Sequence, residues 1–199
     1  MSNRDWNGDA KSVFRGLGAS NHSEQEREAN DYYATEPKAM ELLLEVEQFS
    51  HNIWECACGE KHLSKVLEDA GYNVRNSDLI ERCDGVEILD FLSDEAKEWN
   101  GDIITNPPYK YATQFAKKAL DIIPDGNKVA MFLKIQFLEG KERRKLFEKH
   151  PPKCVYVSTS RLNCAKNGDF KTFTHSAMCY AWYVWEKGYK GDTIIKWIN

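Results

Sequence analysis

The sequence lacks several features that would assign it to a particular class of protein. It has no apolar run near the roughly 18 residues that span a bilayer, and residues 1–16 contain no apolar segment typical of a secretory signal. We therefore expect a cytoplasmic protein. None of the six cysteines forms a Cys-x-x-Cys pair, and the five histidines show no metal-ligand spacing. These absences exclude a disulfide scaffold and predict buried free thiols and no metal site.

Composition and charge indicate a globular protein. The 199 residues are 42% apolar and 29% charged, which suits one domain with a sizeable core. The net charge of −4 argues against a polyanionic partner when it is averaged over the chain. Its distribution is uneven, however. Residues 1–100 carry 10 basic and 22 acidic side chains (−12), whereas residues 128–171 carry 11 and 4 (+7). This basic segment is compatible with nucleic-acid binding if it forms one face.

The order of apolar segments predicts an α/β domain over residues 31–199, preceded by a polar N-terminal arm over residues 1–30. Thr35 is predicted to be the N-cap of a helix that begins near Pro37. Further helices are predicted over 61–70, 110–123 and 138–150, and strands over 52–57, 72–78, 86–91, 102–105, 129–133, 155–159, 177–185 and 193–198. Strands that alternate with helices predict a mostly parallel, Rossmann-like sheet, to which the late strands add a C-terminal antiparallel hairpin.

The most informative motif is Asn106-Pro107-Pro108-Tyr109, which directly follows a predicted strand. Two prolines make this segment stiff and remove two backbone donors. The side chain of Asn106 and the backbone carbonyl of Pro107 can together accept both hydrogens of a planar amino group. The ring of Tyr109 offers a face on which a base can stack. A simple tight turn is the alternative interpretation, since Asn-Pro is common in turns.

Other candidate residues follow the first three predicted strands. Glu55 to Lys61 forms a small-residue turn at a helix N-terminus, where backbone N–H groups can meet a ligand. Asp78, about 20 residues onward, is placed to bind ribose hydroxyls, or is only a turn cap. Asp90 could accept from an exocyclic amino group while Phe91 packs on an adenine; by itself Phe91 is more typical of a core residue.

Basic residues after the fifth predicted strand are candidates for phosphate binding, although a solvated helix face would have the same composition. The polar segment near residues 161–171, with Asn163, Asn167 and Asp169, is a candidate for reading bases. The proposed nucleic-acid-binding residues are Lys141, Arg143, Arg144, Lys145, Arg161, Lys166 and Lys171.

Together these motifs resemble methyltransferases that alkylate an exocyclic or amide nitrogen with S-adenosylmethionine. The chain is most similar to the small N6-adenine DNA methyltransferases of phages and prophages. Residues 137–143 and 181–189 also match that group, and the resemblance covers about residues 30–190. Lys61 stands where the family often has a second glycine, a departure expected to reshape the cofactor loop. The resemblance implies that S-adenosylmethionine contacts Tyr33, Thr35, Glu55, Cys56, Ala57, Gly59, Asp78, Asp90, Phe91 and Asn106.

In mechanism, the resemblance implies a class I methyltransferase that flips an adenine out of DNA. Asn106 and the Pro107 carbonyl would accept from N6, and Tyr109 would stack on the base. Three alternatives remain: the same chemistry on RNA adenine, methylation of a protein glutamine, and a catalytically silent binding module. Glutamine-modifying enzymes usually carry a larger N-terminal substrate domain, which residues 1–30 do not supply.

Overall fold

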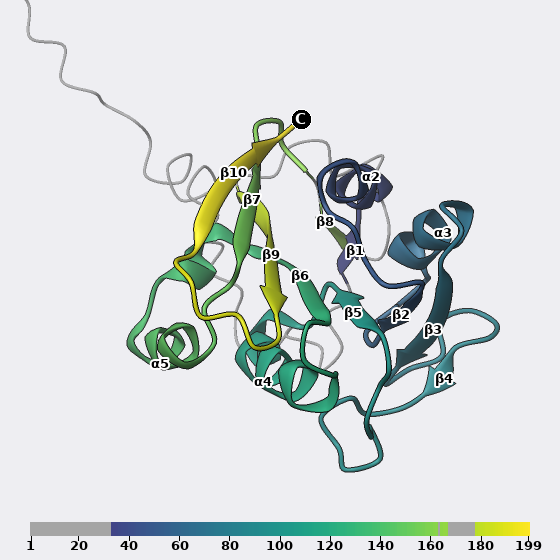
Figure 1. Ribbon diagram of the computed structural model, residues 1–199. Coiled ribbons are helices and arrows are strands. Elements are labelled where there is room, and N and C mark those ends of the chain that lie inside the picture. Colours follow the sequence, from purple (N-terminus) through teal and green to yellow (C-terminus); the bar gives the residue numbers. More distant parts are fainter. Residues whose placement is uncertain (1–32, 163, 167–177) are drawn as a thin grey trace, which may run out of the picture.

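The computed structural model describes residues 33–162, 164–166 and 178–199 (Figure 1). Within these residues one eight-stranded sheet forms the centre of the molecule. Its strands, in spatial order, are β10 (Ile194–Ile198), β7 (Cys154–Ser158), β9 (Tyr180–Glu186), β6 (Lys128–Lys134), β5 (Asp102–Thr105), β2 (Asn52–Glu55), β3 (Asn73–Asp78) and β4 (Glu87–Ile88). The predicted arm over residues 1–30 lies outside the described residues.

The sheet is mostly parallel, which confirms the predicted fold class. β9 alone runs antiparallel to both of its neighbours, β6 and β7. The expected hairpin is present as the antiparallel pair β7–β9, but it is not appended at the edge. β9 lies between β6 and β7, and β10 adds a further parallel strand outside β7. The inserted strand satisfies backbone groups on both of its sides, and every residue from Tyr180 to Trp185 is buried.

Helices cover both faces of the sheet (Figure 1). Helices α2 (Pro37–Val46) and α3 (His62–Asp69) pack on one face, and α4 (Ala112–Ile122) and α5 (Lys141–Lys149) pack on the other. Alternate strand residues therefore join different cores: Ile103 packs with the α4 side and Ile104 with the α2 side. This double covering explains why every residue of β5 is buried, and why β6 contains an apolar run from Val129 to Leu133 instead of an alternating pattern.

Several predicted helix boundaries shift by a few residues. The N-cap of α2 is Glu36 and not Thr35, because Thr35 is the last residue of a short strand. Short 3-10 turns, η2 (Tyr109–Tyr111) and η3 (Ile135–Leu138), precede α4 and α5. Gly71 follows the end of α3 with φ +90°, a left-handed conformation typical of the residue just beyond a helix.

A second, two-stranded sheet was not foreseen. β1 (Tyr33–Thr35) pairs antiparallel with β8 (Cys164–Lys166), with Thr35 opposite Cys164. These segments are far apart in the sequence, and each has only three residues. Their pairing holds the chain that enters α2 against the chain that leads toward β9.

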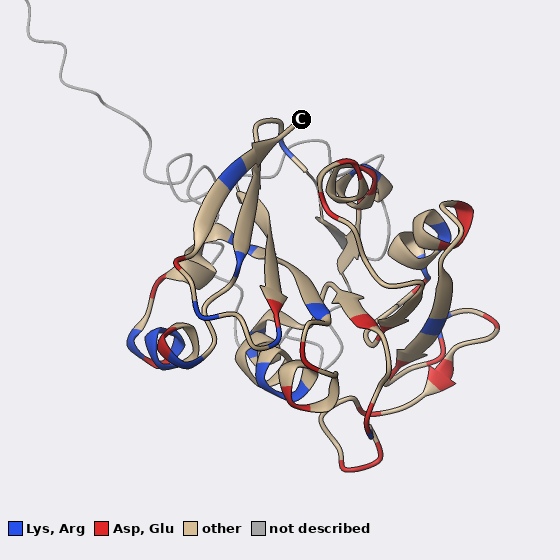
Figure 2. Ribbon diagram, in the orientation of Figure 1, with Lys and Arg blue, Asp and Glu red and all other residues tan. Residues whose placement is uncertain are grey.

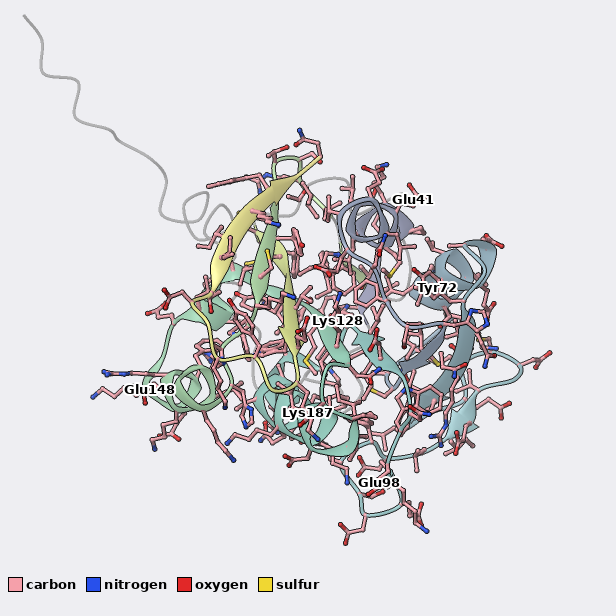
Figure 3. The ribbon with its side chains drawn as sticks, viewed as in Figure 1. Glu41, Tyr72, Glu98, Lys128, Glu148 and Lys187 are labelled. Carbon is pink, nitrogen blue, oxygen red and sulfur yellow. The ribbon has the colours of Figure 1, made fainter. Side chains whose placement is uncertain are left out.

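The amino-terminal edge of the main sheet is braced by polar contacts. The buried carboxylate of Asp102 accepts hydrogen bonds from the backbone N–H groups of Ser50 and Lys128, at 2.6 and 2.7 Å. The ammonium of Lys128, labelled in Figure 3, forms a 2.6 Å ion pair with Glu47. Candidate ligand-binding groups therefore lie at the opposite, carboxyl-terminal edge. No helix in the described ranges is both long and apolar enough to cross a membrane.

Candidate active site

The candidate site lies where β2, β3, β5 and β6 end. The chain leaves β2 toward β3 on one side, whereas β5 is followed by β6 on the other. Adjacent parallel strands whose connections diverge leave a crevice at their carboxyl ends, where α/β proteins bind ligands. Asn106 directly follows β5 at this switch point, and the turn after β2 lies beside it.

The side chain of Asn106 is held in one orientation. Its amide nitrogen donates to the hydroxyl of Thr35 at 2.8 Å and to the carbonyl oxygen of Tyr33 at 3.2 Å. A backbone carbonyl can only accept, so the amide nitrogen must face Tyr33. The contacts from β1 thus decide which end of the amide points into the site.

The opposite end of the Asn106 amide has no partner. Its oxygen is buried and accepts no hydrogen bond from any described residue. Such an acceptor costs roughly 1–3 kcal/mol unless a ligand donates to it. The site therefore presents an oriented acceptor to a group that carries N–H or O–H donors.

Tyr109 lies within a cluster of aromatic and sulfur groups, in which the thiol of Cys164 also contacts the Asn106 amide nitrogen. Its hydroxyl is 3.4 Å from the thiol of Cys164, and its ring centroid is 6.1 Å from that of Tyr180. The ammonium of Lys134 is 5.2 Å from the Tyr109 ring centroid. Burial raises the pKa of the Tyr109 phenol well above its usual value, so the group stays neutral at neutral pH. Tyr109 can supply a surface and a hydroxyl, but not a base.

The turn after β2 is shaped by two left-handed residues. Gly59 has φ +52° and donates its N–H to the carboxylate of Asp78 at 2.9 Å. Lys61 has φ +63°, the only positive φ of a non-glycine residue in the part of the chain that the structure describes. A side chain at such a position costs on the order of 1 kcal/mol. Lys61 stands where the methyltransferases that the sequence resembles often have a second glycine, and its backbone has a conformation typical of glycine.

The Lys61 side chain ties this turn to another loop. Lys61 is the N-cap residue of α3, and its ammonium donates to the carbonyl oxygen of Asp84 at 2.6 Å. The contact links the turn after β2 to the segment between β3 and β4. Both segments border the carboxyl end of β3, where Asp78 lies.

Two of the predicted cofactor residues are buried beneath this turn. Glu55 is 2% exposed and accepts a hydrogen bond from the hydroxyl of Ser64 in α3. Burial raises its pKa well above the usual value, and burial likewise raises the thiol pKa of Cys56. Glu55 and Cys56 therefore support the turn from beneath, while the half-buried Ala57 lies nearer the surface.

The predicted adenosine-binding residues are placed differently from one another. Asp78 is half-buried and already accepts from Gly59, while Asp90 is exposed and caps the backbone N–H of Leu92 at 2.8 Å. Phe91 is 1% exposed and packs against Trp54 and Phe115. A ring so buried has no free face, so the predicted stacking of Phe91 on an adenine does not fit this arrangement.

The motifs in the sequence did not identify some residues that lie at the candidate site. Leu79 directly follows Asp78 and is 59% exposed, an apolar surface at the carboxyl edge of β3. Cys164 and Tyr180 reach Tyr109 only because of the β1–β8 pairing and the insertion of β9. No local pattern signals these two contacts. For Leu79, its place directly after a strand-terminal acid was the available signal.

The predicted basic residues are only partly gathered at the site. Lys and Arg residues are frequent on α4 and α5, and acidic residues are frequent around β4 (Figure 2). Arg144 pairs with Glu148, which is labelled on α5 in Figure 3, and Lys145 pairs with Glu142. Lys141 and Arg161 are exposed. Of the predicted basic residues that the structure describes, Arg143 alone lines the cavity beside Tyr109. The other predicted residues lie outside the described part of the chain: Lys171, the Lys166 side chain, Asn163, Asn167 and Asp169.

The chain matches no protein-family model and no curated protein sequence. Solved structures do match its fold. A candidate class I S-adenosylmethionine-dependent methyltransferase from Listeria monocytogenes has a TM-score of 0.54 at 14% identity, over 79% of this chain and 62% of that one. The modification subunit of a candidate type I restriction enzyme from Vibrio vulnificus has a TM-score of 0.54 at 11% identity, over 94% and 50%. A candidate RNA methyltransferase from Pyrococcus horikoshii has a TM-score of 0.50 at 15% identity, over 75% and 81%.

This chain thus spans between half and two thirds of the length of the Listeria and Vibrio proteins. The likenesses show that it has the class I methyltransferase fold.

Proposed function

We propose that the chain is an S-adenosylmethionine-dependent methyltransferase that methylates N6 of adenine in DNA. The observation that carries the proposal is the buried, unpaired oxygen of Asn106, fixed in orientation by Tyr33 and Thr35. It lies in a Pro-stiffened turn at the switch point of a class I methyltransferase fold. An amino group is the ligand that this acceptor fits.

The residues around the turn after β2 suit the cofactor. Gly59, with positive φ and no side chain, lets the backbone approach a ligand closely, and Asp78 retains lone pairs for ribose hydroxyls. Leu79 provides an exposed apolar surface beside them. S-adenosylmethionine supplies an electrophilic methyl group when it is bound. The β1 segment, through Tyr33 and Thr35, would border the cofactor beside Asn106 and hold the Asn106 amide in place.

The chain's own contribution to the reaction is orientation. The Asn106 oxygen accepts one N6–H, and the Pro107 carbonyl accepts the other, which directs the nitrogen lone pair out of the base plane. Tyr109 contacts the flipped base as a neutral ring. After transfer, the proton that N6 loses passes to solvent, since the described site holds no base with a suitable pKa beside Asn106.

DNA is favoured as the substrate by the resemblance to phage enzymes and by the fold match to a restriction-modification subunit. The fold match to a candidate RNA methyltransferase keeps RNA adenine as the second candidate. Both substrates present the same amino group to Asn106.

The test is methyl transfer from tritiated S-adenosylmethionine to unmethylated DNA, RNA and protein. We expect label in DNA as N6-methyladenine, and we expect Asn106→Ala to abolish transfer while calorimetric cofactor binding persists. Asn106→Asp retains an acceptor and serves as the conservative control. Full turnover by Asn106→Ala, or label only in protein, would refute the proposal.

A further inference from the structure

A small cavity opens beside Tyr109, and the described polar residues that line it are uncharged or basic. Its volume is about 140 Å³. The walls include the apolar side chains of Leu133 and Phe137 and the ring of Tyr109, while Lys134 and Arg143 supply charge. Among the described residues that line it, none is Asp or Glu. Two cations thus face this space, next to the proposed catalytic turn.

Lys134 is a half-buried cation without an acid. It is the last residue of β6, and its ammonium lies over the Tyr109 ring, 5.2 Å from the centroid. Among the described residues no carboxylate forms a salt bridge with it. A partly desolvated ammonium is stabilised by an anion, and the ring quadrupole only partly replaces one.

Arg143 is held at the same cavity by the backbone. Its guanidinium donates to the carbonyl oxygens of Glu139 and Gln136, and its central carbon lies 5.4 Å from the Phe137 ring centroid. These contacts use two of the five N–H donors of the guanidinium and leave the others for a ligand.

Gly140 makes this arrangement possible. It has φ +112°, and a Cβ there would lie 2.9 Å from a terminal nitrogen of Arg143. A side chain at residue 140 would therefore have to displace the guanidinium of Arg143 from this position. Arg144 and Lys145, the next two residues of the same helix, are instead paired with Glu148 and Glu142.

We propose that Lys134 and Arg143 form an anion subsite that binds a phosphate next to the target nucleotide. The inference rests on the proposed function, and it narrows the substrate to nucleic acid, because a protein amide carries no such anion. Arg143 fits a phosphate through its remaining fork of donors, and Lys134 acts as a point charge. The phosphate position would set the register of the base that meets Asn106.

The test is the salt dependence of binding to a fluorescein-labelled DNA duplex, measured without turnover. Each phosphate contact contributes about 0.9 to the slope of log affinity against log salt concentration. Lys134→Gln and Arg143→Gln are each expected to lower the slope by roughly that amount and to weaken binding on the order of tenfold at low salt. Lys134→Arg retains the charge and should restore the slope.

Two control variants separate a local subsite from general surface charge. Lys196 also lies over a tyrosine, 5.9 Å from the Tyr156 ring centroid, but in the edge strand β10. Lys196→Gln is expected to change the slope much less than the two subsite variants. The same is expected of Arg144→Gln, because Arg144, which the sequence predicted to bind nucleic acid, is paired with Glu148. Equal slopes in all variants, or an equal decrease in the controls, would overturn the subsite. Absence of methyl transfer by the wild-type protein would instead count against the proposed function, since the binding slope needs no turnover.

Discussion

Thr35→Val tests whether the β1 segment acts on catalysis through Asn106. Valine has nearly the volume of threonine, and Thr35 is 3% exposed, so packing should be preserved. The change removes the oxygen that accepts from the Asn106 amide at 2.8 Å. It leaves the 3.2 Å contact with the Tyr33 carbonyl and the longer, 3.9 Å contact with the thiol of Cys164. The Asn106 amide would then be less firmly oriented.

The expected loss can be worked from that one hydrogen bond. A neutral hydrogen bond contributes about 0.5–1.5 kcal/mol net, and this corresponds to roughly a 2- to 12-fold decrease in kcat. The sequence alone predicted that Thr35 contacts the cofactor, which would instead raise the cofactor Kd. The two roles therefore differ in which constant changes.

The assay is steady-state methyl transfer to DNA with calorimetric titration of S-adenosylmethionine in parallel. We expect a lower kcat, an unchanged cofactor Kd, and recovery of kcat in Thr35→Ser, which keeps the hydroxyl. A raised Kd with an unchanged kcat would refute the positioning role and return Thr35 to cofactor binding. Thermal unfolding of each variant checks that the β1–β8 pairing survives.

Three further predictions concern stability. Because Lys61 has a left-handed backbone, Lys61→Gly should be about 1 kcal/mol more stable than Lys61→Ala in urea unfolding, although both lose the contact with Asp84; a more stable alanine variant would show that the strain is absent. Gly101→Ala places a Cβ against the carbonyl oxygen of Asn52 and should cost about 1–3 kcal/mol, seen as a lower melting temperature. The pKa of Glu55 is raised in the fold, so stability should decrease as pH rises above its ordinary value of 4.5 toward the folded-state pKa; Glu55→Gln should flatten this dependence in melting curves, and an unchanged slope would contradict it.

The predictable parts of the fold are those that local sequence determines. β6 is one apolar run and appears almost where predicted, and the turn at Asn106-Pro107-Pro108 follows β5 as the prolines require. The insertion of β9 between β6 and β7 was not predictable, because it depends on pairing between distant segments. The local pattern of Tyr180 to Trp185 fits an edge strand and a central one equally well.

The candidate site shows the same division. The identity of Asn106 was readable from its motif, but its orientation depends on Tyr33 and Thr35, more than 70 positions earlier in the chain. Phe91 illustrates the reverse case, since its place in the motif suggested a ligand surface although the ring by itself is more typical of a core residue. Its contacts with Trp54 and Phe115 decide for the core.

The charge of the basic segment acquires a different meaning once the side chains are placed. Its sum over residues 128–171 treats every cation alike, yet Arg144 and Lys145 on α5 are already paired with acids of their own helix. Exposed pairs of this kind contribute little to stability, but they weaken the field that a phosphate would meet. Lys134 and Arg143 face a cavity whose described lining residues include no Asp or Glu. The strength of phosphate binding should therefore depend on the positions of the cations, and not on the net charge of −4.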